Sequence, residues 1–92
     1  MCLIRFTDQG IKTIKNYPKR LEEARRIIEE AGAKALRAYV TLGRYDQILL
    51  MKCPNNEVAV RLSAKLGSLG NVKIETLPAI RAKRFIKIAE KL

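Results

Sequence analysis

An α+β fold with one antiparallel sheet is the architecture that this sequence predicts, and three observations lead to it. The first is a set of four short apolar segments with the length and composition of β-strands. The second is a pair of longer segments with apolar residues at helical spacing, each placed between two of those strands. The third is the lack of any linker, repeat or low-complexity stretch, which indicates that residues 1–92 form one domain.

The first part of the chain predicts a strand followed by an interrupted helix. The strand is expected over residues 1–6 and inside the sheet, and Thr7 and Asp8 are suitable caps for the helix that follows it. Pro18 is acceptable at the start of a helix but not in its middle, so we expect a break there and a second helix that ends at Gly32. The charged face of this second helix is expected to be solvated, and it consists of Arg20, Glu22, Glu23, Arg26, Glu29 and Glu30.

The centre of the chain predicts two strands joined by a turn. They are expected over residues 33–42 and 45–53, with Gly43 in the turn because glycine reaches backbone conformations that are costly for other residues. The side chains of the second strand should alternate between two faces, with Leu36, Ala38, Val40 and Leu42 on one and Arg37, Tyr39 and Thr41 on the other.

A helix, a strand and a short last helix complete the predicted order. One asparagine of residues 54–56 should cap the helix, Gly67 should end it, and the fourth strand should span residues 72–77. The last helix has an apolar side of Phe85, Ile88, Ala89 and Leu92 and a basic side of Lys83, Arg84, Lys87 and Lys91. We expect its apolar side to pack on the domain; the alternative is a basic helix that lies on nucleic acid or on an anionic membrane surface.

The predicted order, βαββαβ with an extra C-terminal helix, is that of the ferredoxin-like fold. In this plan both long helices cover one face of the sheet and leave the other face bare. An uncovered face in so small a domain must be polar or must be covered by a partner. We therefore expect a homodimer or a higher homo-oligomer of the dimeric α/β-barrel type, in which two such faces enclose a partly polar cavity.

Charge and composition restrict the function. The 19 Lys and Arg residues outnumber the 9 Asp and Glu residues and give a net charge of +10, which attracts polyanions. These cations are spread along the chain, however, as is typical of a solvated surface. There is no His, and two Cys are too few for a zinc cluster, so we expect neither a metal nor a cofactor. No signal peptide and no apolar run of membrane-spanning length is recognisable, and we expect a cytoplasmic protein without a membrane partner.

The two cysteines have two interpretations. The first and third strands are neighbours in this fold, so Cys2 and Cys53 approach each other. They would form either a disulfide or a pair of buried thiols, and the reducing cytosol favours thiols.

Three ordered segments resemble the GYD domain family. They are residues 4–12, 39–46 and 66–77, and the family's Gly-x-Tyr-Asp signature stands here as Gly43-Arg44-Tyr45-Asp46. The resemblance covers most of the chain and implies a ferredoxin-like α+β fold, small stand-alone proteins and no assigned activity. A more distant similarity connects the chain to the ligand-sensing domain of leucine-responsive regulators, where a Gly-x-x-Asp turn joins two central strands and effectors bind near dimer contacts.

The candidate ligand-binding or interface residues lie around this signature, and they are Arg37, Tyr39, Thr41, Gly43, Arg44, Tyr45 and Asp46. Asp46 either accepts hydrogen bonds from a ligand or caps backbone N–H groups of the turn. Tyr45 is either an interface anchor or part of the hairpin packing. Arg37, Tyr39 and Thr41 either bind a polar ligand on the bare face or line a dimer interface, and Arg5 of the first strand is placed to join them.

The function that these observations favour is a non-enzymatic, oligomeric ligand-binding or regulatory module for a small polar molecule. One alternative is a nucleic-acid-binding protein that uses its distributed basic surface. Another is a cofactor-free enzyme of the dimeric α/β-barrel type, for which Tyr45 and Asp46 would be the only catalytic pair.

Overall fold

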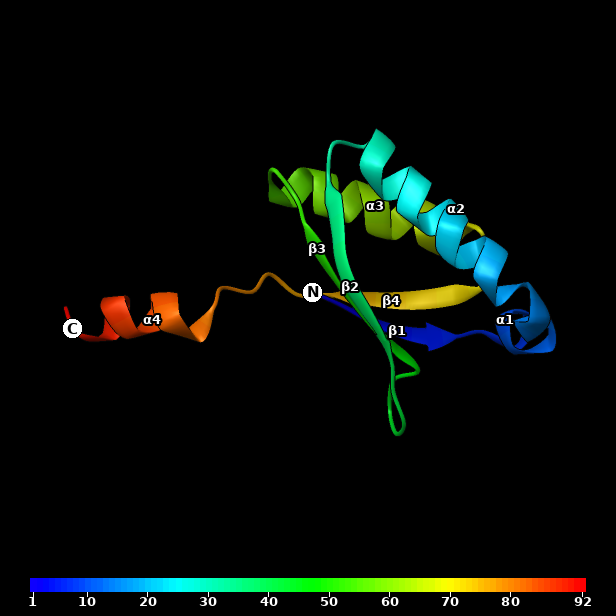
Figure 1. Ribbon diagram of the computed structural model, residues 1–92, viewed down its shortest axis with the longest axis horizontal. Helices are drawn as coiled ribbons and strands as arrows, with labels where there is room; N and C mark the ends of the chain where they lie inside the picture. Colours follow the sequence, from blue (N-terminus) through cyan, green and yellow to red (C-terminus); the bar gives the residue numbers. More distant parts are fainter.

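A computed structural model describes residues 1–92 and has the predicted βαββαβ order followed by an additional helix (Figure 1). The strands are β1 (Cys2–Phe6), β2 (Lys34–Val40), β3 (Gln47–Lys52) and β4 (Val72–Thr76). The helices are α1 (Asp8–Lys12), the short 3-10 helix η1 (Ile14–Asn16), α2 (Tyr17–Glu30), α3 (Asn56–Ser68) and α4 (Ala82–Ala89). The sheet is antiparallel with the order β2-β3-β1-β4, which is consistent with the ferredoxin-like fold and places β1 inside the sheet as predicted.

The core lies between the sheet and the two long helices, α2 and α3, which cover the same face (Figure 1). Its buried apolar side chains are Cys2, Ile4, Ile28, Ala33, Leu49, Leu62 and Leu66. The core is therefore mainly aliphatic, as a chain with five aromatic residues and no Trp requires. The other face of the sheet has no helix over it.

The predicted break in the first helical segment is confirmed. α1 ends at Lys12, η1 follows, and Pro18 lies in the first turn of α2, where its missing N–H costs nothing. Thr7 caps α1 as predicted, since its hydroxyl accepts the N–H of Gly10 at 3.0 Å. Gly32, with φ of +85°, follows the end of α2 in a left-handed conformation.

The ends of α3 confirm one prediction and correct another. Asn55 caps the helix, because its side-chain oxygen accepts the N–H of Val58 at 2.9 Å. The prediction that Gly67 ends the helix was wrong, since α3 continues to Ser68. Gly70 instead adopts the left-handed conformation, with φ of +87°, and redirects the chain into β4.

The register of β2 confirms the predicted alternation from Arg37 to Val40 and corrects it on either side of that stretch. An irregularity between Ala35 and Arg37 shifts the pairing with β3. Beyond it, Ala38 lies opposite buried Leu49 and so faces the helices, while Arg37 lies on the bare face. β2 also ends at Val40, so the prediction that Leu42 belongs to the apolar strand face was wrong; its side chain is fully exposed in the turn.

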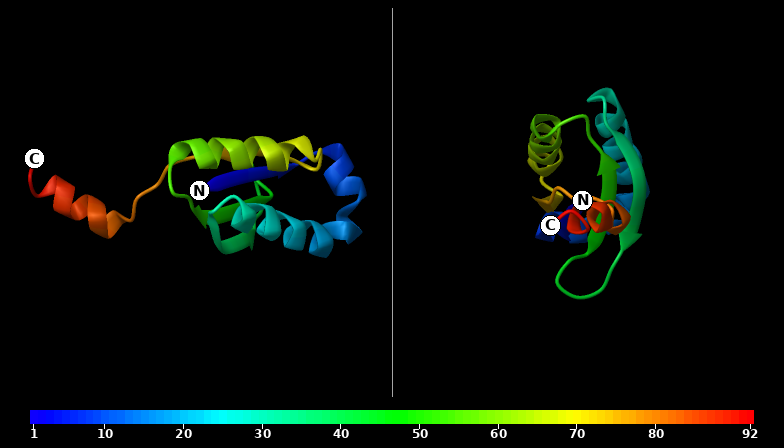
Figure 2. Two further views of the ribbon diagram at one scale, coloured as in Figure 1. Left: turned by 90° about the horizontal axis from the view of Figure 1, so that it is seen from above. Right: turned by 90° about the vertical axis from the view of Figure 1, so that its left-hand side faces the viewer.

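The expectation that α4 packs on the domain was wrong. Figures 1 and 2 show α4 extending away from the domain along the long axis of the molecule. Its apolar residues Phe85, Ile86 and Ile88 remain 55%, 54% and 47% exposed. The bare face of the sheet is therefore not covered by α4. None of the helices combines the length and the apolar composition that crossing a membrane requires.

Candidate functional site

The signature turn is held to β1 through Asp46. The carboxylate of Asp46 accepts the N–H of Phe6 at 2.8 Å, and the N–H of Asp46 donates to the carbonyl of Ile4 at 2.8 Å. The hydroxyl of Thr41 donates to the carbonyl of Tyr45 at 2.7 Å, which closes the turn from the other side. The structure therefore favours the interpretation of Asp46 and Thr41 as residues that shape the turn.

Tyr45 belongs to a polar row on the bare face of the sheet. Its hydroxyl donates to Oε2 of Glu75 at 2.6 Å, and the guanidinium of Arg5 lies 5.3 Å from the centre of its ring. A shallow hollow of about 270 Å³ adjoins this row and includes Leu3 and Lys73. The structure thus brings Tyr45 together with Arg5, which the sequence placed on this face, and with Glu75, which sequence reasoning missed.

The remaining sequence candidates are spread along the β2–β3 hairpin. Gly43 has φ of +96°, which confirms that the turn uses a conformation suited to glycine. Arg44 beside it is exposed. Arg37 and Tyr39 share the bare face through their pairing with β3, but they lie on the edge strand, two strands away from Arg5. The structure does not gather the predicted residues into one site.

Residues 4–12 and 66–77, the other two segments that resemble the family, are joined by contacts of Thr7 and Gly10. The hydroxyl of Thr7 donates to the carbonyl of Gly70 at 2.7 Å, and its N–H donates to the carbonyl of Asn71 at 3.0 Å. Gly10 packs so closely on this connection that any β-carbon there would collide with the backbone carbonyl of Asn71. Since Asp46 binds Phe6, all three segments meet at the end of β1, and sequence reasoning missed this shared role.

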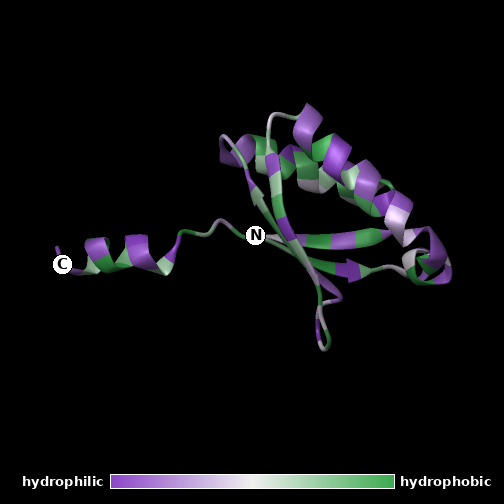
Figure 3. Ribbon diagram, viewed as in Figure 1, coloured by the Kyte–Doolittle hydropathy of each residue, from purple (hydrophilic) through white to green (hydrophobic).

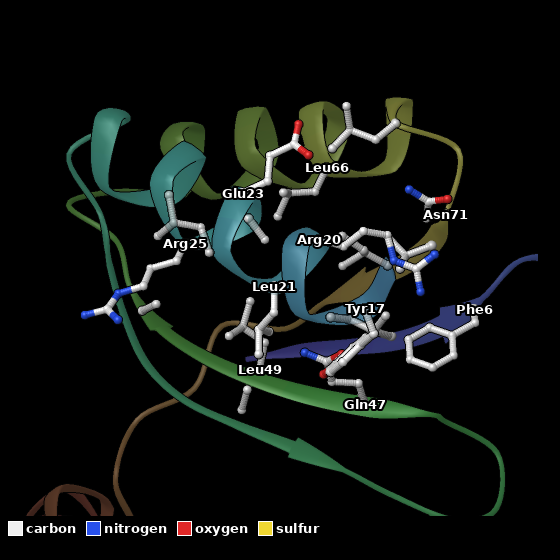
Figure 4. A pocket seen from close by; sticks show the side chains of 18 of the residues that line it. Phe6, Tyr17, Arg20, Leu21, Glu23, Arg25, Gln47, Leu49, Leu66 and Asn71 are labelled. Atoms are coloured by element: carbon white, nitrogen blue, oxygen red, sulfur yellow. The ribbon is translucent and has the colours of Figure 1, made fainter. Parts of the chain in front are cut away.

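A cavity of about 560 Å³ lies on the helix-covered side of the sheet, between α2, β2 and the α3–β4 connection (Figure 4). Fourteen of its twenty lining residues are hydrophobic, among them Leu21, Ile28, Leu36 and Leu49. The sequence led us to expect a partly polar cavity on the opposite face. The apolar lining favours a ligand with a hydrocarbon or aromatic body.

Polar groups gather at one end of this cavity (Figure 4). The hydroxyl of Tyr17 donates to Oε1 of Gln47 at 2.9 Å, and Gln47 is itself 6% exposed. Burial raises the pKa of the Tyr17 hydroxyl, and the nearby guanidinium of Arg20 partly opposes this rise. Tyr17 therefore keeps its proton at neutral pH and serves as a hydrogen-bond donor.

Arg20 is one of four charged residues that line the cavity, and it lies at the polar end beside Tyr17 and Gln47. Its Nη1 donates to the carbonyl of Gly10 at 3.1 Å and to Oγ1 of Thr13 at 2.9 Å, and its guanidinium lies 6.0 Å from the centre of the Phe6 ring. Its Nη2 is buried and has no hydrogen-bond partner. A buried charged donor without an acceptor is costly, so an acceptor that reached Nη2 would be bound favourably.

Arg20 was expected on the solvated face of its helix, and the structure corrects this prediction. The helix begins at Tyr17, directly after the break, and this start turns Arg20 toward α1 and the cavity. The available signal was its position two residues after Pro18, in the first turns of the new helix. That signal places the residue near a helix start but does not show which way the side chain points.

Both cysteines are free thiols in the structure. Cys2 is buried, with its sulfur 3.8 Å from Oγ1 of Thr76. Burial, and secondarily the neighbouring Cys2, raises the pKa of the Cys53 thiol. No group of three or more His, Cys, Asp or Glu residues is placed to hold a metal ion.

These features define a ferredoxin-like α+β domain with one bare sheet face and an apolar cavity under α2. The sequence matches the family model of the GYD domain over residues 1–89. The chain therefore belongs to the GYD domain family, as its three segments predicted, and the match includes α4. Neither a curated protein nor a solved structure matches the chain significantly.

Proposed function

We propose that this protein is a non-enzymatic, self-associating domain that binds a small amphipathic anion in the cavity under α2. The observation that supports it most directly is Nη2 of Arg20, a buried cationic donor without a partner at the polar end of an apolar cavity. A carboxylate is the acceptor that best matches a guanidinium, because the two groups form paired, charge-assisted hydrogen bonds.

The cavity also limits the size and character of the ligand. Its volume of about 560 Å³ lies within the range of small-molecule sites. The predominantly apolar lining disfavours the small polar molecule that the sequence suggested and favours a hydrocarbon or aromatic body with one acidic group. Tyr17 and Gln47 supply further hydrogen bonds beside Arg20.

Self-association through the bare face remains part of this proposal. Leu3, Ile48 and Leu50 lie in the middle of that face and are only partly covered within one chain. A second copy would remove them from water. The enzyme alternative has less support, because Tyr45 and Asp46 are already engaged by Glu75 and by the backbone of Phe6.

The direct test titrates the protein with decanoate and, separately, with decanol, and follows backbone amide signals by NMR. Decanoate should shift amides of α2 and β2, and decanol should bind at least about tenfold more weakly because it lacks the charge that pairs with Arg20. Equal binding of the two probes, or shifts confined to other elements, would contradict the assignment.

Two variants separate the cavity from the rest of the domain. Arg20→Gln should abolish the preference for decanoate, while Arg26→Gln, an exposed arginine of the same helix, should leave it unchanged. Because Arg20 also holds the carbonyl of Gly10, Ala24→Leu serves as a second variant that fills the cavity without touching its polar end. Undiminished decanoate binding by Ala24→Leu would exclude this cavity as the site.

A further inference from the structure

We propose that α4 binds flat to an anionic membrane surface, with its apolar side among the lipid chains and its basic side at the headgroups. The proposal goes beyond ligand binding and does not depend on the cavity. α4 extends from the domain and combines hydrophobic and hydrophilic residues (Figure 3), and its large apolar side chains are exposed.

Residues 82–92, which are α4 and the three residues that follow it, have their apolar and polar side chains on two different sides of a helical projection. At 100° per residue, the apolar residues fall on one continuous arc: Ala82, Phe85, Ile86, Ile88, Ala89 and Leu92. The polar residues fall on the remaining arc: Lys83, Arg84, Lys87, Glu90 and Lys91. A short helix with large apolar residues on one side and lysines on the other is typical of peripheral membrane contacts.

The connection to the domain lets α4 take up this position. β4 is held at its end, because the N–H of Leu77 donates to the carbonyl of Met1 at 2.7 Å. α4 begins at Ala82, after a short connection that contains Pro78. Leu92 is 98% exposed and Ile80, in the connection, is 56% exposed, so the apolar surface extends past both ends of the helix.

The charge of α4 distinguishes between the partners that could cover its apolar side: a second copy of the chain, a nucleic acid or a lipid surface. Residues 81–92 hold five cations against Glu90, a net charge of +4, and residues 1–80 carry the other +6 of the chain. Docking on a second copy would therefore bring like net charges together. Binding to nucleic acid would satisfy the cations but leave Phe85 and Ile88 in water. An anionic lipid surface satisfies both sides of the helix.

The test is cosedimentation of the full chain with large vesicles of phosphatidylcholine, alone or with about one third phosphatidylglycerol. The protein should bind the anionic vesicles at least about tenfold more tightly than the neutral ones, and added salt should weaken this binding. Failure to bind the anionic vesicles, or equal binding to both compositions, would overturn the proposal.

Variants show whether α4 is the contact. The double substitution Phe85→Ser with Ile88→Ser should lower the vesicle affinity at least about tenfold. Val60→Ser is the matched control, because Val60 is an apolar residue 67% exposed on α3, and this variant should bind like the unchanged protein. Unchanged affinity of the double variant would overturn the proposal. So would a fall in its mass in solution without vesicles, because that result would assign the helix to contacts between copies.

Discussion

At the scale of single residues, Asp46 shows why a carboxylate in a signature need not contact a ligand. Its carboxylate accepts the N–H of Phe6, which lies in the neighbouring strand and would otherwise lose its partner. We predict that Asp46→Ala lowers the free energy of unfolding by about 1–3 kcal/mol, since it leaves that N–H without an acceptor. Asp46→Asn keeps an acceptor oxygen and should cost less. Urea unfolding measures both, and equal stability of Asp46→Ala and the unchanged protein would contradict the assignment.

Two helical glycines should respond in opposite directions to the same substitution. Gly10→Ala places a β-carbon against the backbone carbonyl of Asn71, and it should lower the free energy of unfolding by about 2 kcal/mol or more. Gly67 has open space around it inside α3, so Gly67→Ala should raise the free energy of unfolding by about 0.5–1 kcal/mol. Thermal unfolding of the two variants tests this contrast, and a shift of the same sign in both would refute it.

We predict that the protein loses stability at alkaline pH, because the side chains of Tyr17 and Cys53 are protonated in the folded state. Burial raises the pKa of Tyr17 above 10.0 and the pKa of Cys53 above 9.0. Each group holds its proton more tightly in the folded state than in the unfolded state. Its contribution to the free energy of unfolding is therefore complete below the pKa of the unfolded state, and it is lost as the pH rises through the pKa of the folded state. The free energy of unfolding should therefore decline from about pH 9 upward. The double variant Tyr17→Phe with Cys53→Ala should show a smaller decline in urea unfolding, and an identical decline would contradict this cause.

At the scale of helices and strands, the features that depend on neighbouring residues were predictable from the sequence. The break before Pro18 and the caps at Thr7 and Asn55 are local and are confirmed, and so is the role of Gly32 in stopping α2, which ends at Glu30. Gly67 was misassigned because two glycines lie three residues apart, and only the path into β4 decides which of them takes the left-handed conformation.

Features that depend on contacts between distant elements were not predictable in this way. The irregularity in β2 results from its pairing with β3, and it moves Leu36 out of the expected alternation. Arg20 becomes a cavity residue only because Gly10 of α1 and Thr13, which follows that helix, supply acceptors for its Nη1. The helical pattern of α4 was visible in the sequence, but whether any part of the domain covers it is a property of the whole chain.

At the scale of the whole molecule, the bare face combines opposing contributions to self-association. Its middle is apolar, with Leu3, Ile48 and Leu50, which favours pairing of two faces. The register also places four cationic residues and one anionic residue on this face. The cations are Arg5, Arg37, Lys52 and Lys73, and the anion is Glu75. Pairing two such faces brings positive charges together, and only part of that repulsion is offset by Glu75. The balance between these contributions should therefore depend on ionic strength.

We predict that the protein associates into dimers or larger assemblies at micromolar concentration and that added salt strengthens this association. Raising the salt from about 0.05 M to about 0.5 M shortens the Debye length and screens the cations, while the apolar contact persists. Ile48→Lys should give the mass of a single chain, and Val60→Lys, at an exposed position of α3, should not. Sedimentation equilibrium at the two salt concentrations measures these masses. An association that weakens with salt would point instead to a polyanion that bridges the copies, because binding through phosphate contacts has the opposite dependence on salt.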